Sequence, residues 1–259
     1  MSLHSGDTLD SDPREPRTVA LLSDVHGNLP AFKAVLADIA GSGADETWCL
    51  GDLVGYGAQP DECVTLATEE CDLCLVGNHD LVVLGKLDIA DFSENAAIAA
   101  GWTRDKISAQ SIAFLSGLAS QDLARAIGLY HASPRDPVWE YVVSDTLADI
   151  CIDAMPSRVS AVGHSHLALY FGRAERDVTG GAIAPEGTEI DLSCGRWLIN
   201  PGAVGQPRDG DPRAAWLLLS LERWTATWRR VDYPIDEAAS AIEDAGLPKA
   251  LADRLRYGR

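Results

Sequence analysis

The sequence lacks any apolar run that approaches the roughly 20 residues a helix needs to cross a membrane. It is also short of positive charge, since 21 Lys and Arg face 39 Asp and Glu and the formal net charge is −18. Binding to a nucleic-acid backbone depends on basic residues that neutralise phosphates. We therefore expect neither a membrane nor a nucleic acid as partner. A small phosphorylated partner remains compatible with this charge, because bound metal cations can reverse the local field.

The cysteines do not form a paired zinc motif. Cys71 and Cys74 make one C-x-x-C, but no second pair follows. Leu73, Leu75 and Val76 predict a strand there, so buried structural thiols are favoured over a zinc or redox site. The six cysteines are Cys49, Cys63, Cys71, Cys74, Cys151 and Cys194. Free thiols without a signal-peptide pattern indicate a reducing cytoplasm.

The chain divides into a short leader and one domain. Residues 1–17 are polar and acidic with two prolines, which predicts a disordered leader that includes His4. Residues 18–259 contain no linker-like stretch. Their length suits one large α/β domain, and a composition of 46% hydrophobic and 23% charged residues is that of an ordinary globular protein.

Strands and helices alternate in the first third of the domain. Short apolar runs at 18–22, 46–50 and 73–76 predict strands, and the segments 30–40 and 61–70 predict helices between them. Asp24, Asp52 and Asn78 follow the three strands. Since ligands of open α/β sheets lie at the carboxyl ends of the strands, we expect these polar side chains to share one edge.

The remainder is predicted to mix helices with a strand-rich segment. Helices are expected at 93–104, 108–115 and 144–154, each opening with a serine that suits an N-cap, and at 236–244 and 248–257. Strands are expected at 126–130, 159–162, 168–172, 188–192, 197–199, 215–221 and 224–230, the last two as a hairpin. The Gly-rich segment 177–187 is predicted to be a surface loop.

Five of the six histidines follow predicted strands closely: His26, His79, His131, His164 and His166. One such histidine would ordinarily be a hydrogen-bonded core residue. Five together with Asp24, Asp52 and Asn78 favour a metal site instead. Asp24 and His26 are two residues apart, as are His164 and His166, so in extended backbone each pair would project to one side. Imidazole, carboxylate and amide ligands together suit Mn, Fe, Zn, Co or Ni, whereas carboxylates alone would suggest Mg or Ca.

The order of these blocks resembles the calcineurin-like metallophosphoesterase family. The matching blocks are Ser23-Asp24-Val25-His26-Gly27-Asn28, Gly51-Asp52, Gly77-Asn78-His79-Asp80, His131 and Gly163-His164-Ser165-His166. The loop 200–208 is similar to one in a small bacterial branch of phosphodiesterases and diadenosine-tetraphosphatase-like enzymes. The resemblance covers roughly residues 19–230. It implies a four-layer α/β/β/α sandwich of two mixed sheets with metals at one edge.

The resemblance also implies a role for each residue. Asp24, His26 and His166 would hold one metal ion, Asn78, His131 and His164 would hold a second, and Asp52 would bridge them. Two divalent transition metal ions, with manganese the first expectation, can activate a bridging hydroxide for attack on phosphorus. His79 would act as general acid on the leaving group. Asp80 would either orient His79 or cap the following helix.

One block departs from other branches of the family. Where the protein phosphatases and diadenosine tetraphosphatases carry Asp and a phosphate-clamping Arg, this chain has Gly55 and Tyr56. Arg208 is therefore a candidate substrate contact, with a surface ion pair as its alternative. Tyr56 is another candidate, which would either stack on a base or cover the core.

Four further side chains have two interpretations each. Trp139 and Tyr141 would form one wall of the cleft or pack in the core. Asn200 is expected to satisfy the backbone of its own loop rather than to contact substrate. Arg213 is expected to form a surface ion pair.

The sequence thus predicts a dinuclear-metal-dependent phosphoester hydrolase, a phosphodiesterase or phosphatase. Its expected substrate is a small phosphorylated molecule, with nucleotide-derived compounds considered first. The alternative is a regulatory or ligand-binding module that keeps the metals but turns over little. The missing arginine at position 56 supports that alternative.

Overall fold

A computed structural model describes residues 17–174 and 178–259 and contains two mixed six-stranded sheets. The first has the strand order β3-β2-β1-β11-β12-β9 and the second β4-β5-β6-β10-β7-β8. In the first sheet β1 pairs parallel with β2 and antiparallel with β11. In the second, β10 pairs parallel with β6 and antiparallel with β7. The two mixed sheets confirm the predicted fold class.

The elements of the first half carry the β-α-β-α-β alternation that was predicted. They are β1 (Thr18–Leu22), α1 (Leu29–Ala40), β2 (Glu46–Cys49), α2 (Pro60–Glu70), β3 (Leu73–Cys74), α3 (Asn78–Val83), the 3-10 helix η1 (Ile89–Asp91), α4 (Glu94–Lys106), α5 (Ala109–Ser116), β4 (Gln121–Asp122) and β5 (Gly128–Tyr130). Asn78 follows β3 as expected and opens the short helix α3.

The second half is dominated by strands and closes with two helices. Its elements are α6 (Asp145–Ala154), β6 (Val159–Ala161), β7 (Ala168–Arg173), β8 (Gly180–Ile183), β9 (Glu189–Asp191), β10 (Arg196–Pro201), β11 (Ala214–Ser220), β12 (Thr225–Val231), α7 (Ile235–Asp244) and α8 (Lys249–Leu255). The prediction of a loop over 177–187 was wrong in part, because residues 180–183 pair with β7 as an exposed edge strand.

Three apolar clusters separate the layers. The alternation of side chains along β1 sends Val19 and Leu21 between the two sheets and Ala20 and Leu22 toward the helices. The cluster between the sheets also contains Trp48, Leu129, Leu217 and Trp228. Helices α1, α2, α7 and α8 cover the outer face of the first sheet, and α6 packs on the second.

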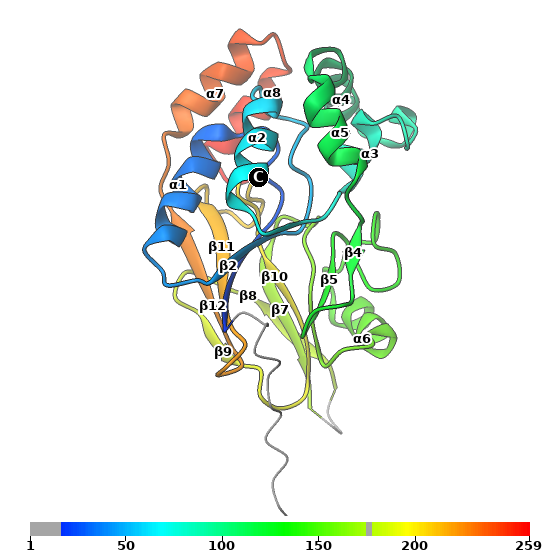
Figure 1. Ribbon diagram of the computed structural model, residues 1–259, viewed down its shortest axis with the longest axis vertical. Coiled ribbons are helices and arrows are strands. Elements are labelled where there is room, and N and C mark those ends of the chain that lie inside the picture. The colour runs from blue at the N-terminus through cyan, green and yellow to red at the C-terminus, as the bar shows by residue number, and fades with distance from the viewer. Residues whose placement is uncertain (1–16, 175–177) are drawn as a thin grey trace, which may run out of the picture.

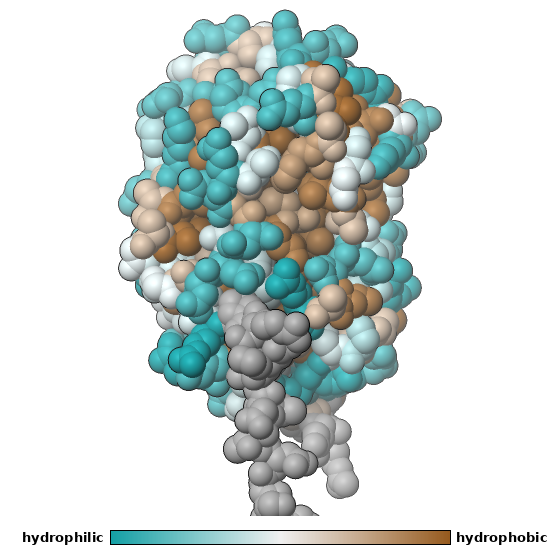
Figure 2. Space-filling view, in the orientation of Figure 1, coloured by the Kyte–Doolittle hydropathy of each residue, from teal (hydrophilic) through white to brown (hydrophobic). Residues whose placement is uncertain are grey.

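Helix α7 packs against both α1 and α8. Figure 1 shows α7 and α8 next to α1 and α2, above the two sheets, with α6 on the opposite side. Figure 2 shows the surface from the same direction as Figure 1, with hydrophilic residues over most of it and hydrophobic residues along its middle. The C-terminal helices therefore pack beside the first helix of the chain's described part.

The predicted leader falls almost wholly outside the described residues. Of residues 1–17 only Arg17 is described, and its backbone N–H donates to Asp45 at 3.0 Å. All six cysteines lie in described parts of the chain, and none forms a disulfide. Among the described helices, none combines the length and the apolarity that crossing a bilayer requires.

A buried ion pair ties the loop after β10 to the sheet. Arg230 on β12 pairs with Asp209, and the two side chains are 2% and 1% exposed. Replacing Arg230 with Met should lower the free energy of unfolding by about 3–5 kcal/mol, because Asp209 would be left buried without its cation. Urea denaturation would measure the change. The exposed pair of Lys249 and Asp253 supplies the control, since Lys249→Ala should alter stability little. Similar effects of both variants would contradict this account.

Candidate metal centre

Polar residues from both sheets meet beyond the carboxyl ends of their strands. Asp24 and His26 follow β1, Asp52 follows β2 and Asn78 begins α3 directly after β3. His131 follows β5 directly, and His164 and His166 follow β6. All seven side chains are buried. The structure therefore brings together the set expected from the sequence.

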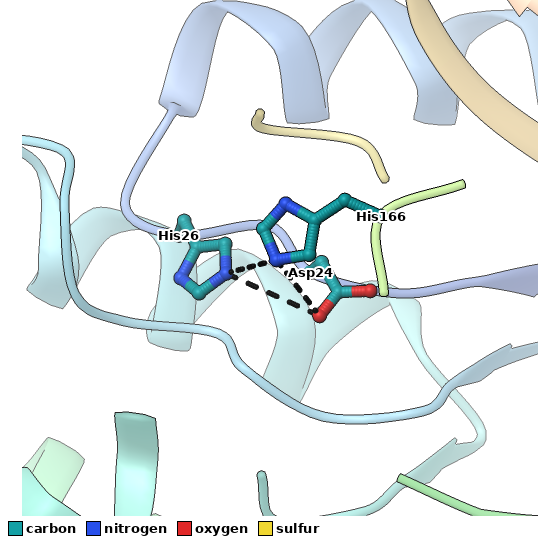
Figure 3. A group of neighbouring side chains, drawn as sticks. All are labelled: Asp24, His26 and His166. Carbon is teal, nitrogen blue, oxygen red and sulfur yellow. Dashed lines mark hydrogen bonds and ion pairs between the residues drawn. The ribbon is translucent and has the colours of Figure 1, made fainter. Parts of the chain in front are cut away.

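These residues form two groups that could each hold a metal ion. One is Asp24, His26 and His166, and the other is Asp52, His131 and His164, with the ligand atoms of each group within 4.8 Å of one another. Figure 3 shows the first group converging from the β1 and β6 loops. There His26 Nε2 lies 3.1 Å from His166 Nε2, and Asp24 Oδ1 lies 3.5 Å from the latter.

Asp52 belongs to the second group and also lies close to the first. Its Oδ2 is 3.6 Å from His26 Nε2 and 3.5 Å from His131 Nε2. Asn78 stands beside the second group, with Oδ1 3.2 Å from His131 Nε2. Asp52 Oδ1 accepts a hydrogen bond from the backbone N–H of His79 at 2.8 Å, which leaves Oδ2 directed at the histidines.

Backbone carbonyls fix the tautomers of all four candidate histidine ligands. A carbonyl oxygen can only accept a hydrogen bond, so a ring nitrogen that bonds one must carry the proton. This places the proton on Nδ1 in three histidines: His26 donates to Val54, His131 to Leu50 and His166 to Gln206. His164 has the opposite tautomer, with the proton on Nε2, because its Nε2 donates to the Trp139 carbonyl at 3.1 Å.

The tautomers have a consequence for the first group. His26 and His166 both present Nε2 lone pairs, which face each other at 3.1 Å with no proton between them. Two lone pairs at this distance repel unless a cation lies beside them. The donor set of the first group thus fits a metal ion.

The buried carboxylates fit a metal as well. Asp24 Oδ1 and Asp52 Oδ2 are buried and have no hydrogen-bond partner among residues 17–174 and 178–259. Burial raises the pKa of Asp24 to about 7, and burial followed by the nearby charge of Asp80 raises the pKa of Asp52 well above its usual range. A divalent cation would offset the cost of keeping both ionised in this interior.

The histidines respond to the same environment. Burial, followed by neighbouring positive charge, lowers the pKa of His26 and His166 well below the usual value and that of His164 to about 2. Unprotonated imidazole is the form that binds metals.

The backbone at the site is left-handed, not extended. Asp24, His26, Asp52, His164 and His166 have φ between 50° and 61°. The expectation that each pair shares a face of extended chain is therefore wrong, because both members of each pair adopt the αL conformation. Such φ values are unfavourable for non-glycine residues and concentrate at functional sites.

Hydrogen bonds between loops hold this conformation. The backbone N–H groups of Asp24 and His26 donate to Gly51 and Asp52 at 3.0 and 2.9 Å. Asp80 accepts from the N–H groups of Asp52, Val54 and Gly77. Gly77 is the N-cap of α3, so Asp80 caps this helix and also fixes the Asp52 loop. Of its two interpretations, the cap is the one that these contacts support.

His79 lies beside the metal groups in an aromatic environment. Its ring centroid is 4.8 Å from that of His26, 4.4 Å from Tyr56 and 5.1 Å from Phe92. His79 Nδ1 is buried, and no described residue forms a hydrogen bond with it. Burial and then the charge of Arg208 lower the pKa of His79 to about 3.

The two candidate substrate contacts touch each other. Arg208 Nη2 donates to the Tyr56 hydroxyl at 3.3 Å, and its guanidinium lies over the phenol ring at 5.7 Å. Tyr56 is 8% exposed and packs on His26 and His79. With its ring in these contacts, Tyr56 covers the site, and the base-stacking role receives no support from its surroundings.

Other sequence candidates occupy distinct positions. Tyr141 is 46% exposed with its ring 4.0 Å from that of His164, and the Trp139 carbonyl accepts from His164, so both border the site as a wall would. Asn200 Oδ1 accepts from the backbone N–H of Gly202 in its own loop, as expected, and Asn200 Nδ2 also donates to the Gly163 carbonyl and the Ser165 hydroxyl in the loop after β6. Arg213 pairs with Asp211 and Glu186 near the surface, also as expected.

Two residues near the site had no role in the sequence interpretation. Gln206 is 1% exposed, and its carbonyl accepts from His166 at 2.6 Å. Its position inside the loop 200–208 was the available signal. Arg254 on α8 donates to the Gln206 side chain at 3.4 Å, and no local pattern marks it.

Comparisons with known proteins agree with this geometry. A family model described as the calcineurin-like phosphoesterase superfamily domain matches residues 18–223. An uncharacterized protein of Methanocaldococcus jannaschii is 37% identical over 246 residues, 93% of this chain and 98% of that protein. A metallophosphoesterase structure from Sphaerobacter thermophilus has a TM-score of 0.85 at 36% identity, covering 95% of this chain and 100% of that one. A hypothetical protein from Pyrococcus horikoshii shares the fold, with a TM-score of 0.75 at 17% identity over 93% and 98% of the two chains.

The close approach of Gly77 to Asp52 can be tested directly. A Cβ at position 77 would lie 2.1 Å from Asp52 Oδ1 and 2.6 Å from His131 Cε1, so Gly77→Ala must displace a candidate ligand. We expect its affinity for Mn²⁺, measured by calorimetry, to fall about 10–100-fold. Gly180→Ala is the matched control, because no atom of the described residues lies within 4 Å of a Cβ at this position. Unchanged Mn²⁺ affinity in a folded Gly77→Ala protein would show that the site tolerates this displacement.

Proposed function

The chain belongs to the calcineurin-like phosphoesterase superfamily, and from this premise we propose that it hydrolyses a small phosphorylated substrate with two divalent metal ions. The observation that carries the proposal is the position of Asp52. Its unpartnered Oδ2 lies within 3.6 Å of a histidine from each of the two groups. One carboxylate oxygen between two sets of imidazoles suits a ligand shared by two ions.

The proposed ligand sets follow this geometry. Asp24, His26 and His166 would hold one ion, Asn78, His131 and His164 the other, and Asp52 both. When bound, such ions supply the activation of water and the stabilisation of phosphoryl charge that in-line displacement requires. Manganese is our first expectation, with Fe, Zn, Co and Ni as alternatives, because the ligands mix imidazole with carboxylate and amide oxygen.

The remaining chemistry is assigned to the protein's own side chains. Carbonyl acceptors hold the four imidazoles in one orientation, and burial excludes bulk water from them. We assign proton donation to the leaving oxygen to His79, since its Nδ1 has no partner among the described residues, and the negative charge of a bound phosphate would oppose the effects that lower its pKa. Arg208, held by the Tyr56 hydroxyl, would contact substrate oxygen.

The proposed substrate is a phosphodiester or phosphomonoester of small size. The net charge of −18 disfavours nucleic acid, whereas the partly exposed Tyr141 ring beside His164 suits a nucleotide-derived compound. A cytoplasmic location, suggested by free thiols, is part of the same proposal.

Hydrolysis of bis(4-nitrophenyl) phosphate with Mn²⁺ tests the proposed function. The wild-type protein should release 4-nitrophenol, lose this activity with a chelator and recover it with added Mn²⁺. Asp52→Asn and His164→Ala should each lower turnover by at least about 100-fold, because each removes a ligand. Circular dichroism would verify that both variants fold.

Two results would count against an enzyme. Wild-type turnover in a folded Asp52→Asn protein would contradict the role of Asp52. Tight binding of phosphorylated compounds without turnover, across nucleotides, dinucleoside polyphosphates, cyclic nucleotides and phosphoproteins, would favour the low-turnover module instead.

The role of His79 calls for a separate measurement. His79→Ala should keep both metal ions, as counted by elemental analysis, but lose about 10²–10⁴-fold in kcat. The loss should shrink as the phenol leaving group becomes more acidic, because such a group departs without protonation. Loss of metal from this variant, or a loss in kcat that is independent of the leaving group, would refute the assignment.

A further inference from the structure

Two arginines from distant parts of the chain meet at one glutamine. Gln206 Oε1 accepts from Arg208 Nη2 at 3.1 Å and from Arg254 Nη1 at 3.4 Å. Arg254 belongs to the last helix, α8, outside the residues 18–223 that the family model matches. The docking of α8 therefore brings a second guanidinium to the first.

Neither arginine has an acidic partner among the described residues. Arg213 and Arg230, from the same part of the fold, pair with carboxylates. Arg208 and Arg254 contact a neutral amide instead, in a chain with 39 acidic residues. Burial and then the charge of Arg208 lower the pKa of Arg254. An anion between the two guanidinium groups would offset this repulsion.

The cluster formed by Gln206, Arg208 and Arg254 also contains buried hydrogen-bond donors without acceptors. Within the described part of the chain, Gln206 Nε2 and Arg208 Nε both lack a hydrogen-bond partner, although Gln206 is only 1% exposed. Buried donors of this kind ordinarily find an acceptor. A ligand that carries several acceptor oxygens would satisfy them.

The cluster is joined to the first metal group through the backbone. The Gln206 carbonyl accepts from His166 Nδ1 at 2.6 Å, and the Arg208 N–H donates to the His166 carbonyl at 3.2 Å. His26, Tyr56 and Gln206 line one small cavity together with Leu255 of α8. Arg208 therefore borders the first metal group, and Arg254 is linked to it through the Gln206 side chain.

We propose that Arg208 and Arg254 together bind a second phosphate of the substrate, adjacent to the phosphoryl group that is attacked. This inference rests on the proposed function and narrows its substrate class to compounds with two or more linked phosphates. Arginine suits the task because its planar donors match phosphate oxygens in pairs. Other branches of the family place a phosphate-clamping arginine where this chain has Tyr56. The pair of Arg208 and Arg254 would take over that role.

Two nucleotides that differ by one phosphate test the clamp. The α,β-methylene analogue of adenosine 5′-diphosphate and adenosine 5′-monophosphate would be titrated into the Mn²⁺-loaded protein by calorimetry, with Mn²⁺ in excess. The wild type should bind the diphosphate analogue more tightly. Arg254→Gln should raise the Kd of the diphosphate analogue about 10-fold more than the Kd of the monophosphate, because the variant loses one charged hydrogen-bonding partner of the second phosphate. Arg254→Lys should keep part of the preference.

Arg256→Gln is the matched control. Arg256 follows α8 directly but pairs with Asp236 and Asp253, so its loss should leave both Kd values unchanged. A wild-type protein without preference for the diphosphate analogue would overturn the inference, as would equal weakening of both nucleotides in Arg254→Gln. Because calorimetry does not require turnover, failure of the clamp and failure of hydrolysis remain distinguishable.

Discussion

The site depends on a backbone constraint: five candidate metal ligands occupy the left-handed region of φ. Asp24, His26, Asp52, His164 and His166 share this conformation, which costs about 1–3 kcal/mol at a non-glycine residue. Hydrogen bonds between neighbouring loops, with Asp80 accepting three of them, hold the strained segments. Small residues are needed around them, since a Cβ at Gly77, Gly163 or Gly205 would lie within 2.1 Å of a site residue or its neighbour. The interloop hydrogen bonds hold the strained backbone, and the glycines leave the space that it requires.

Charge explains the rest of the site's surroundings. The site collects two buried carboxylates, each with an oxygen that no described residue bonds, four imidazoles oriented by carbonyls, and two half-buried arginines without acidic partners among the described residues. Each is unfavourable alone in a buried setting. Two metal ions and a polyanionic substrate would satisfy all of them. Proposed ligands, proposed proton donor and proposed phosphate clamp are therefore parts of one electrostatic design.

Local pattern was enough to predict much of this architecture. Apolar runs ending at Asp24, Asp52 and Asn78 predicted the strands and the shared edge, and the order of the blocks predicted the sandwich. Backbone torsion at Asp24 and His26 was not predictable, because contacts with residues 51–57 impose it. Nor was β8, whose glycines favour a turn until β7 offers a partner. Asp80 and Arg254 depend likewise on neighbours distant in the sequence.

The distribution of the site over both sheets has a consequence for biosynthesis. His26 and His166 approach to 3.1 Å although 140 residues separate them along the chain. A nascent polypeptide that has emerged only as far as the first three strands carries Asp24, His26, Asp52 and Asn78 without their partners. It cannot assemble either complete ligand set until β6 and the loop beyond it have left the ribosome. The order of synthesis would thus postpone the binding of the proposed metal ions until both sheets can pair, and Arg254 would join the site after the seven candidate ligands.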